Sequence, residues 1–130
     1  LAQTPISNPG SSNWKDMIPH REEVFLEGVD YFKDFLAIEE KKEGLSHIRI
    51  IKRADNSEHN LEFGEPAYTA GLGYNPEFET KTLRYSYTSM TTPNSTFDYD
   101  METREKTLMK EQPVLGNFNK ANYETERIMV

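Results

Sequence analysis

The chain has 130 residues with a formal net charge of −7, from 15 basic and 22 acidic side chains, and it contains no cysteine. This length allows one ordinary domain or part of a larger one, and the lack of cysteine excludes disulfides, thiolate zinc sites and a cysteine nucleophile. The absence of a basic block argues against nucleic acid as a partner. No apolar run approaches the roughly 18 residues of a membrane helix, so a membrane is not expected as a partner either.

Three prolines that recur every 47 residues organise the chain. Each follows a large apolar residue by five positions. The pairs are Trp14 with Pro19, Leu61 with Pro66, and Leu108 with Pro113. A period between about 40 and 50 residues is typical of propeller blades or of helical repeats. The start of the chain has neither an initiator Met nor a signal-peptide pattern, so we expect the chain to begin inside a longer protein.

The repeats contain short segments with strand character, four in each complete repeat. Residues 1–18 match only the last two, at 1–6 and 14–18, which predicts the outer strands of a preceding blade. Residues 19–65 form the first full blade, with strands expected at 27–31, 35–41, 46–53 and 60–63. Residues 66–112 form the second full blade, with strands expected at 67–74, 82–90, 96–101 and 106–110. Residues 113–130 follow the repeats as an exit segment.

Period-two alternation favours strands over helical repeats. Leu83, Tyr85 and Tyr87 alternate with polar residues, and no segment sustains the apolar spacing of an amphipathic helix. Turn-forming residues separate the segments, for example at 43–44 and 92–94. The sequence therefore predicts an all-β fold of antiparallel four-stranded β-propeller blades, in which the tyrosines fill the core rather than a ligand site.

No set of residues forms a recognisable catalytic centre. A hydrolase nucleophile elbow reads Gly-x-Ser-x-Gly, and the nearest match, around Ser46, lacks the second glycine. Ser46 and His47 are neighbours in an expected strand, so their side chains should point to opposite faces. The acidic residues of 98–102 are expected to be solvated rather than to bind calcium. We predict no catalytic, cofactor or metal site, with His59 in a loop and the mixed-charge run 39–43 at a solvated edge.

Several segments resemble the last part of the propeller of oligopeptidase B, also called protease II. They are residues 14–23, 26–28, 34–40, 44–45, 83–93, 98–102 and 121–127. The Tyr-Thr-Ser-Met-Thr-Thr-Pro stretch that ends at Pro93, followed by Ala-Asn-Tyr at 121–123, carries most of the likeness. The resemblance covers nearly the whole chain and implies the prolyl oligopeptidase family of serine peptidases.

The resemblance implies a seven-bladed propeller joined to an α/β-hydrolase domain that cleaves short peptides after Arg or Lys. In such proteins the propeller restricts access to the active site, so folded proteins are excluded. Residues 123–130 resemble the exit toward the hydrolase domain. The implied partners are that domain of the same chain and short peptide substrates. The family often has Gly where Arg104 stands, and Arg tolerates a left-handed turn conformation poorly.

Topology adds an expectation about orientation. The chain leaves the last outer strand near Pro113, and the turn between strands two and three of an antiparallel blade lies on that same side. The turns expected to face the hydrolase domain are those at Pro19, Glu43, Gly44, Pro66, Thr91, Thr92 and Pro93. Two and a half blades are expected to leave two broad apolar faces and free strand edges, so we also expect the chain to self-associate.

Two other functions stay open at this stage. The chain could belong to a stand-alone β-propeller interaction scaffold, or to a carbohydrate-active propeller with paired carboxylates. The sequence beyond Val130 would separate these functions from a peptidase, because a downstream Gly-x-Ser-x-Gly followed by Asp and His marks the hydrolase. The cysteine-free composition fits a reducing compartment, so we expect the cytoplasm, with the periplasm as an alternative.

Overall fold

The computed structural model describes residues 1–130, whose strands form three antiparallel sheets. A two-stranded ribbon pairs β1 (Ala2–Gln3) with β2 (Lys15–Asp16). The first large sheet has the order β3 (Val24–Tyr31), β4 (Phe35–Lys42), β5 (Leu45–Lys52) and β6 (Glu58–Asn60). The second consists, in order, of β7 (Tyr68–Leu72), β8 (Thr82–Ser89), β9 (Ser95–Asp100) and β10 (Lys106–Glu111). Two short 3-10 helices are η1 (Ser11–Asn13) and η2 (Lys120–Asn122).

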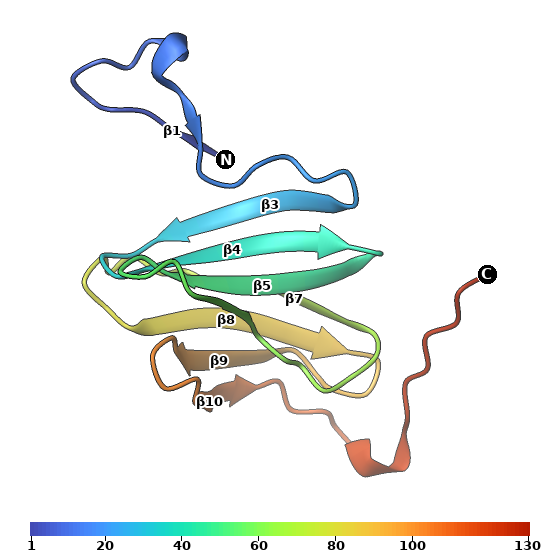
Figure 1. Cartoon of the computed structure of the whole chain (residues 1–130). Coiled ribbons are helices and arrows are strands. Elements are labelled where there is room, and N and C mark those ends of the chain that lie inside the picture. The colour runs from blue at the N-terminus through green and yellow to red at the C-terminus, as the bar shows by residue number, and fades with distance from the viewer.

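The two large sheets lie against each other, and the β1–β2 ribbon lies beyond β3, away from the second sheet (Figure 1). Strand order follows the sequence in both sheets, which confirms the all-β fold and its antiparallel strands.

The fourth strand of the first sheet was expected at 60–63, and this is wrong because β6 ends at Asn60. Asp55 accepts a 2.9 Å hydrogen bond from the backbone N–H of Ser57, and this tight turn lets the strand begin early. His59 therefore lies in a strand rather than a loop.

An apolar layer between the two sheets forms the main core. Its buried residues are Phe32, Phe35, Ala37, Ile48, Ile50, Leu61, Ala70, Leu83, Tyr85, Tyr87, Tyr99 and Met101. Tyr85 is 1% exposed and stacks on Phe97, with the ring centroids 5.3 Å apart. Burial of side chains of this size is worth about 1.5–3 kcal/mol each. The alternating tyrosines of β8 are thus part of the core, as predicted, and they join the two sheets.

The outer faces of the two sheets differ in chemistry. On the first sheet Leu36 and Ile38 are buried against Ile18, which follows the ribbon. The second sheet instead presents the hydroxyl and charged side chains of Thr69, Arg84, Ser86, Thr88, Thr96 and Asp98. The expectation of two broad apolar faces is therefore wrong for the second sheet, because the residues of β8 that do not enter the core are polar. Self-association stays a prediction, which now rests on the free strand edges.

Glu40 is the centre of a charge network on the outer face of the first sheet. Its side chain is only 6% exposed and accepts hydrogen bonds from Arg21 and Arg49, and Arg49 also contacts Glu58. Burial alone would raise the pKa of Glu40, but the hydrogen bonds from Arg49 and Arg21 outweigh it and lower the pKa. The expectation that 39–43 lies at a solvated edge is wrong for Glu40, since β4 is an interior strand with both faces covered.

Positive φ angles mark two of the hairpin turns. Glu43 and Gly44 have φ angles of 51° and 77° and form the two-residue connection between β4 and β5, as predicted. Arg104 has a φ of 68° in the β9–β10 turn, a conformation that suits glycine. Asp100 stabilises this turn, because its Oδ1 accepts hydrogen bonds of 2.8 Å from two backbone N–H groups. The strain at Arg104 is therefore imposed by the surrounding turn.

Replacement of Arg104 by Gly should stabilise the fold. A left-handed conformation costs an L-residue about 1–2 kcal/mol, and the greater freedom of Gly in the unfolded chain offsets part of the gain. We expect Arg104→Gly to raise the free energy of unfolding by about 0.5–1 kcal/mol in urea denaturation. Arg104→Ala is the matched control, because it removes the guanidinium but keeps Cβ. Equal stability of the two variants would contradict the strain argument.

Candidate functional site

One edge of the molecule gathers several connections between strands, and we call it the exit-side edge. It comprises the β4–β5 turn, the connection 61–67 between the two large sheets, the β8–β9 turn and the start of the exit segment after β10. These connections lie on the right in Figure 1, where the C-terminal segment also runs. Arg127 donates a hydrogen bond to the backbone carbonyl of Glu43. The exit segment therefore returns along this edge from β10 to the β4–β5 turn.

The structure brings most of the predicted facing turns to the exit-side edge. Glu43, Gly44 and Pro66 are exposed there, and Thr91, Thr92 and Pro93 are half-buried. Pro19 is also exposed and lies in the connection from β2 to β3. The contact of these turns with a hydrolase domain stays a prediction.

The carboxylate of Glu65 is the centre of the hydrogen bonding at this edge. Glu65 precedes Pro66, and its two oxygens accept hydrogen bonds from four hydroxyl groups. The donors are Tyr87, Ser89 at 2.7 Å, Thr91 at 2.5 Å and Thr92 at 3.0 Å. We call these five residues the Glu65 cluster. One carboxylate thus links the connection between the sheets to the β8–β9 turn.

The Glu65 cluster stays in one protonation state near neutral pH. Partial burial alone would raise the pKa of Glu65, but the hydroxyl donors outweigh it and lower the pKa to about 2. Burial and the hydrogen bond to Glu65 raise the pKa of Tyr87. A carboxylate with so low a pKa is a poor general base near neutral pH. The arrangement therefore serves to hold the turn rather than to transfer protons.

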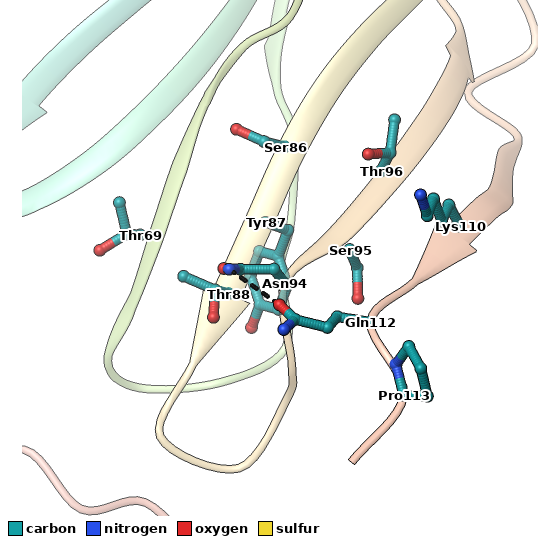
Figure 2. Close-up of a pocket in the computed structure, with 10 residues that line it drawn as sticks. All are labelled: Thr69, Ser86, Tyr87, Thr88, Asn94, Ser95, Thr96, Lys110, Gln112 and Pro113. Carbon is teal, nitrogen blue, oxygen red and sulfur yellow. Dashed lines mark hydrogen bonds between the residues drawn. The ribbon is translucent and has the colours of Figure 1, made fainter. Parts of the chain in front are cut away.

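Beside the cluster, a pocket of about 430 Å³ opens on the polar outer face of the second sheet. Figure 2 shows the ten lining residues, which are Thr69, Ser86, Tyr87, Thr88, Asn94, Ser95, Thr96, Lys110, Gln112 and Pro113. Asn94 Nδ2 lies 3.4 Å from Gln112 Oε1, so these two amides connect the β8–β9 turn to the end of β10. The lining contains no carboxylate or histidine that could activate a hydroxyl. The pocket offers a hydrogen-bonding surface rather than a catalytic centre.

The residues that sequence patterns single out for chemistry are separated or already paired. Ser46 is buried and His47 half-buried, and their alternation along β5 places them on opposite faces, as predicted. Asp98 forms an ion pair with Arg84 at 2.8 Å. No group of three or more His, Asp or Glu side chains lies close enough to hold a metal ion. None of the helices has the length and apolar character needed to cross a membrane.

The sequence analysis missed the role of Glu65. Its first hydroxyl partner, Tyr87, is 22 residues away and its last, Thr92, is 27 residues away, so no local spacing connects them. The available signal was the concentration of hydroxyl side chains in residues 87–92. The acceptor could not be identified from that signal, because it depends on how the connection between the sheets crosses the end of β8.

The low pKa of Glu65 predicts a specific pH dependence of stability. Because the folded-state pKa of about 2 lies below the ordinary glutamate pKa of 4.5, the contribution of Glu65 to stability is fully present above pH 4.5 and is lost as the pH falls toward 2. We expect the unfolding free energy of wild type to decline more steeply over this range than that of Glu65→Gln. The control is Glu62→Gln, since the exposed Glu62 side chain makes no hydrogen bond. Parallel pH profiles for wild type and Glu65→Gln would contradict the assignment.

The sequence of this chain matches a known protein family and several of its members. Residues 1–112 match the family described as the prolyl oligopeptidase N-terminal β-propeller domain. Dipeptidyl aminopeptidase BI from Pseudoxanthomonas mexicana is 41% identical over 98% of this chain and 17% of its own length. Protease 2 from Moraxella lacunata is 26% identical over 98% of this chain and 18% of its own length.

Two solved structures have the same fold. Oligopeptidase B from Leishmania major has a TM-score of 0.81 and 28% identity over 96% of this chain and 19% of its own. Oligopeptidase B from Trypanosoma brucei, in a closed form with covalently bound antipain, has a TM-score of 0.79. It is 28% identical over 90% of this chain and 18% of its own. The chain therefore spans less than a fifth of each of these relatives. These matches confirm the resemblance found in the sequence, and the chain belongs to the prolyl oligopeptidase family as part of an N-terminal β-propeller domain.

Proposed function

We propose that this chain is the part of a β-propeller that adjoins the catalytic domain of a serine peptidase, which cleaves short peptides after Arg or Lys. We call the longer protein that would contain it the parent protein. The observation that carries the proposal is the extent of the likeness. The family match ends at residue 112, whereas the 41% identical relative, a peptidase by name, matches 98% of the chain. The exit segment is therefore included in the likeness to peptidases.

In this proposal the chain acts as scaffold and gate, and the catalytic groups lie outside it. The apolar layer between the sheets makes a rigid wall. The exit-side edge faces the catalytic domain, and two apolar side chains there, Met90 and Leu115, are 88% and 94% exposed. Because both side chains line one groove, they form a joint apolar surface that suits a contact with another part of the protein. A rigid propeller beside the active site would admit short peptides and exclude folded proteins.

A second candidate is the release of dipeptides from the amino end of peptides. The observation that favours it is the name of the 41% identical relative, a dipeptidyl aminopeptidase. The two activities differ in what the site must recognise, because an aminopeptidase binds a free amino group and an endopeptidase does not. An interaction scaffold without catalysis is the third outcome.

We also propose the cytoplasm as the location of the parent protein, with the periplasm as an alternative. Its support is the absence of cysteine, which suits a reducing compartment. Cell fractionation followed by immunodetection of the parent protein tests this location.

Peptide hydrolysis by the parent protein separates the three candidate functions. We expect cleavage of an amino-blocked peptide with Arg or Lys before a fluorogenic leaving group, inactivation by a serine-directed phosphonate, and no cleavage of a folded protein. Hydrolysis only of the substrate with a free amino-terminal dipeptide would favour the second candidate. A parent protein that cleaves neither peptide would contradict both peptidase functions.

The proposed orientation predicts that bulk at the exit-side edge impairs activity. Glu43→Trp places a large side chain in the exposed β4–β5 turn and should lower kcat/KM of the parent protein about tenfold, because small misplacements of catalytic groups are costly. Arg104→Trp is the matched control. Arg104 is also exposed with a positive φ, but its turn between β9 and β10 lies at the opposite edge. Equal kinetics of the two variants would refute this orientation.

A further inference from the structure

The β8–β9 turn presents apolar groups to solvent beside the exit segment. Met90 at its tip is 88% exposed, and Leu115 of the exit segment is 94% exposed. A groove of about 480 Å³ lies between them and is lined by residues of both segments. Val114 and Phe118 extend this apolar lining and are 47% and 38% exposed. A surface of this kind at the place where the chain leaves the propeller fits a neighbouring domain of the same protein.

Side-chain hydrogen bonds determine the shape of this turn. Ser89 Oγ accepts hydrogen bonds from the backbone N–H groups of Thr91 at 3.1 Å and Thr92 at 2.8 Å. Thr88 Oγ1 donates to the backbone carbonyl of Thr92 at 3.1 Å. The same Ser89 hydroxyl donates to Glu65, as do those of Thr91 and Thr92. The turn thus has its own framework, and Glu65 connects this framework to the segment between the two large sheets.

The position of Glu65 is itself fixed by the connection between the sheets. Gly64 has a φ of +76°, which turns the chain so that the next side chain meets the end of β8. Phe63 packs on the core, with its ring stacked on Tyr87 at 5.4 Å between centroids. No Lys or Arg forms an ion pair with the Glu65 carboxylate. Its full hydrogen-bonding capacity is therefore directed at hydroxyl groups of β8 and the β8–β9 turn.

We infer that Glu65 is a positioning residue, which holds the β8–β9 turn in the shape that the catalytic domain of the parent protein contacts. This inference rests on the proposed function, in which the exit segment leads into that domain. A turn that is already ordered loses less conformational entropy when it docks, so docking is more favourable. Four donors on one carboxylate provide that order from within this chain.

Photo-crosslinking in the full-length parent protein tests this inference. A benzoylphenylalanine placed at the exposed position Met90 should crosslink to a residue beyond Val130. With Glu65→Gln the crosslink yield should fall about tenfold, as expected for the loss of hydrogen bonds to a charged acceptor. The control Glu62→Gln, three residues away with an exposed side chain, should retain the wild-type yield. The kcat/KM of the two variants should follow the same order.

Thr92→Val keeps the inference testable if Glu65→Gln does not fold. It removes one donor of the Glu65 cluster and keeps the side-chain volume, so we expect a smaller loss of crosslinking with unchanged thermal unfolding. A wild-type yield in every folded variant would overturn the inference while leaving peptidase function intact. Absence of the crosslink in wild type would also overturn it, and peptide hydrolysis by the same protein would still decide the proposed function separately.

Discussion

The packing of the two large sheets against each other is the interaction on which the other features depend. Tyr85 and Leu83 of β8 meet Ile48 and Ile50 of β5 in one buried layer, although the two strands are far apart in sequence. Each such side chain contributes about 1.5–3 kcal/mol by burial. This layer sets the distance between the sheets, and it thereby determines where the connection 61–67 passes the end of β8.

The exit-side edge derives its order from that packing. Phe63 is part of the aromatic contacts around Tyr87, so the chain before Glu65 is anchored in the core. Two residues later, the carboxylate of Glu65 meets the hydroxyls of the β8–β9 turn. A polar cluster at the surface is thus continuous with the apolar core beneath it. This continuity explains how an edge made only of connections can have a defined surface.

The outer face of the second sheet is polar, so it differs from the apolar layer that lies between the two large sheets. The first sheet is covered on both faces, by the second sheet on one side and by Ile18 and its neighbours on the other. The second sheet has Thr69, Ser86 and Thr96 on the face that no part of this chain covers. Whatever contacts that face must satisfy hydroxyl groups rather than bury apolar surface.

The sequence by itself determined the strands and their periodicity, because alternation and turn residues are local properties of the chain. The 47-residue spacing of Pro19, Pro66 and Pro113 and the alternation of Leu83 and Tyr85 predict two four-stranded units. The observed strands agree, except that β3 and β6 each begin two or three residues earlier than expected and β6 ends at Asn60. The short stretch ending at Pro93 and the likeness it carries were also readable without a structure.

Only the tertiary structure decided which charged residues are buried and what they contact. Glu40 and Arg49 are close in sequence to exposed lysines and glutamates, and only their place on an interior pair of strands buries them. Glu65 meets its partners across at least 22 residues because two sheets pack in one particular way. Such contacts depend on the relative positions of distant segments, which pattern and propensity along a single chain do not specify.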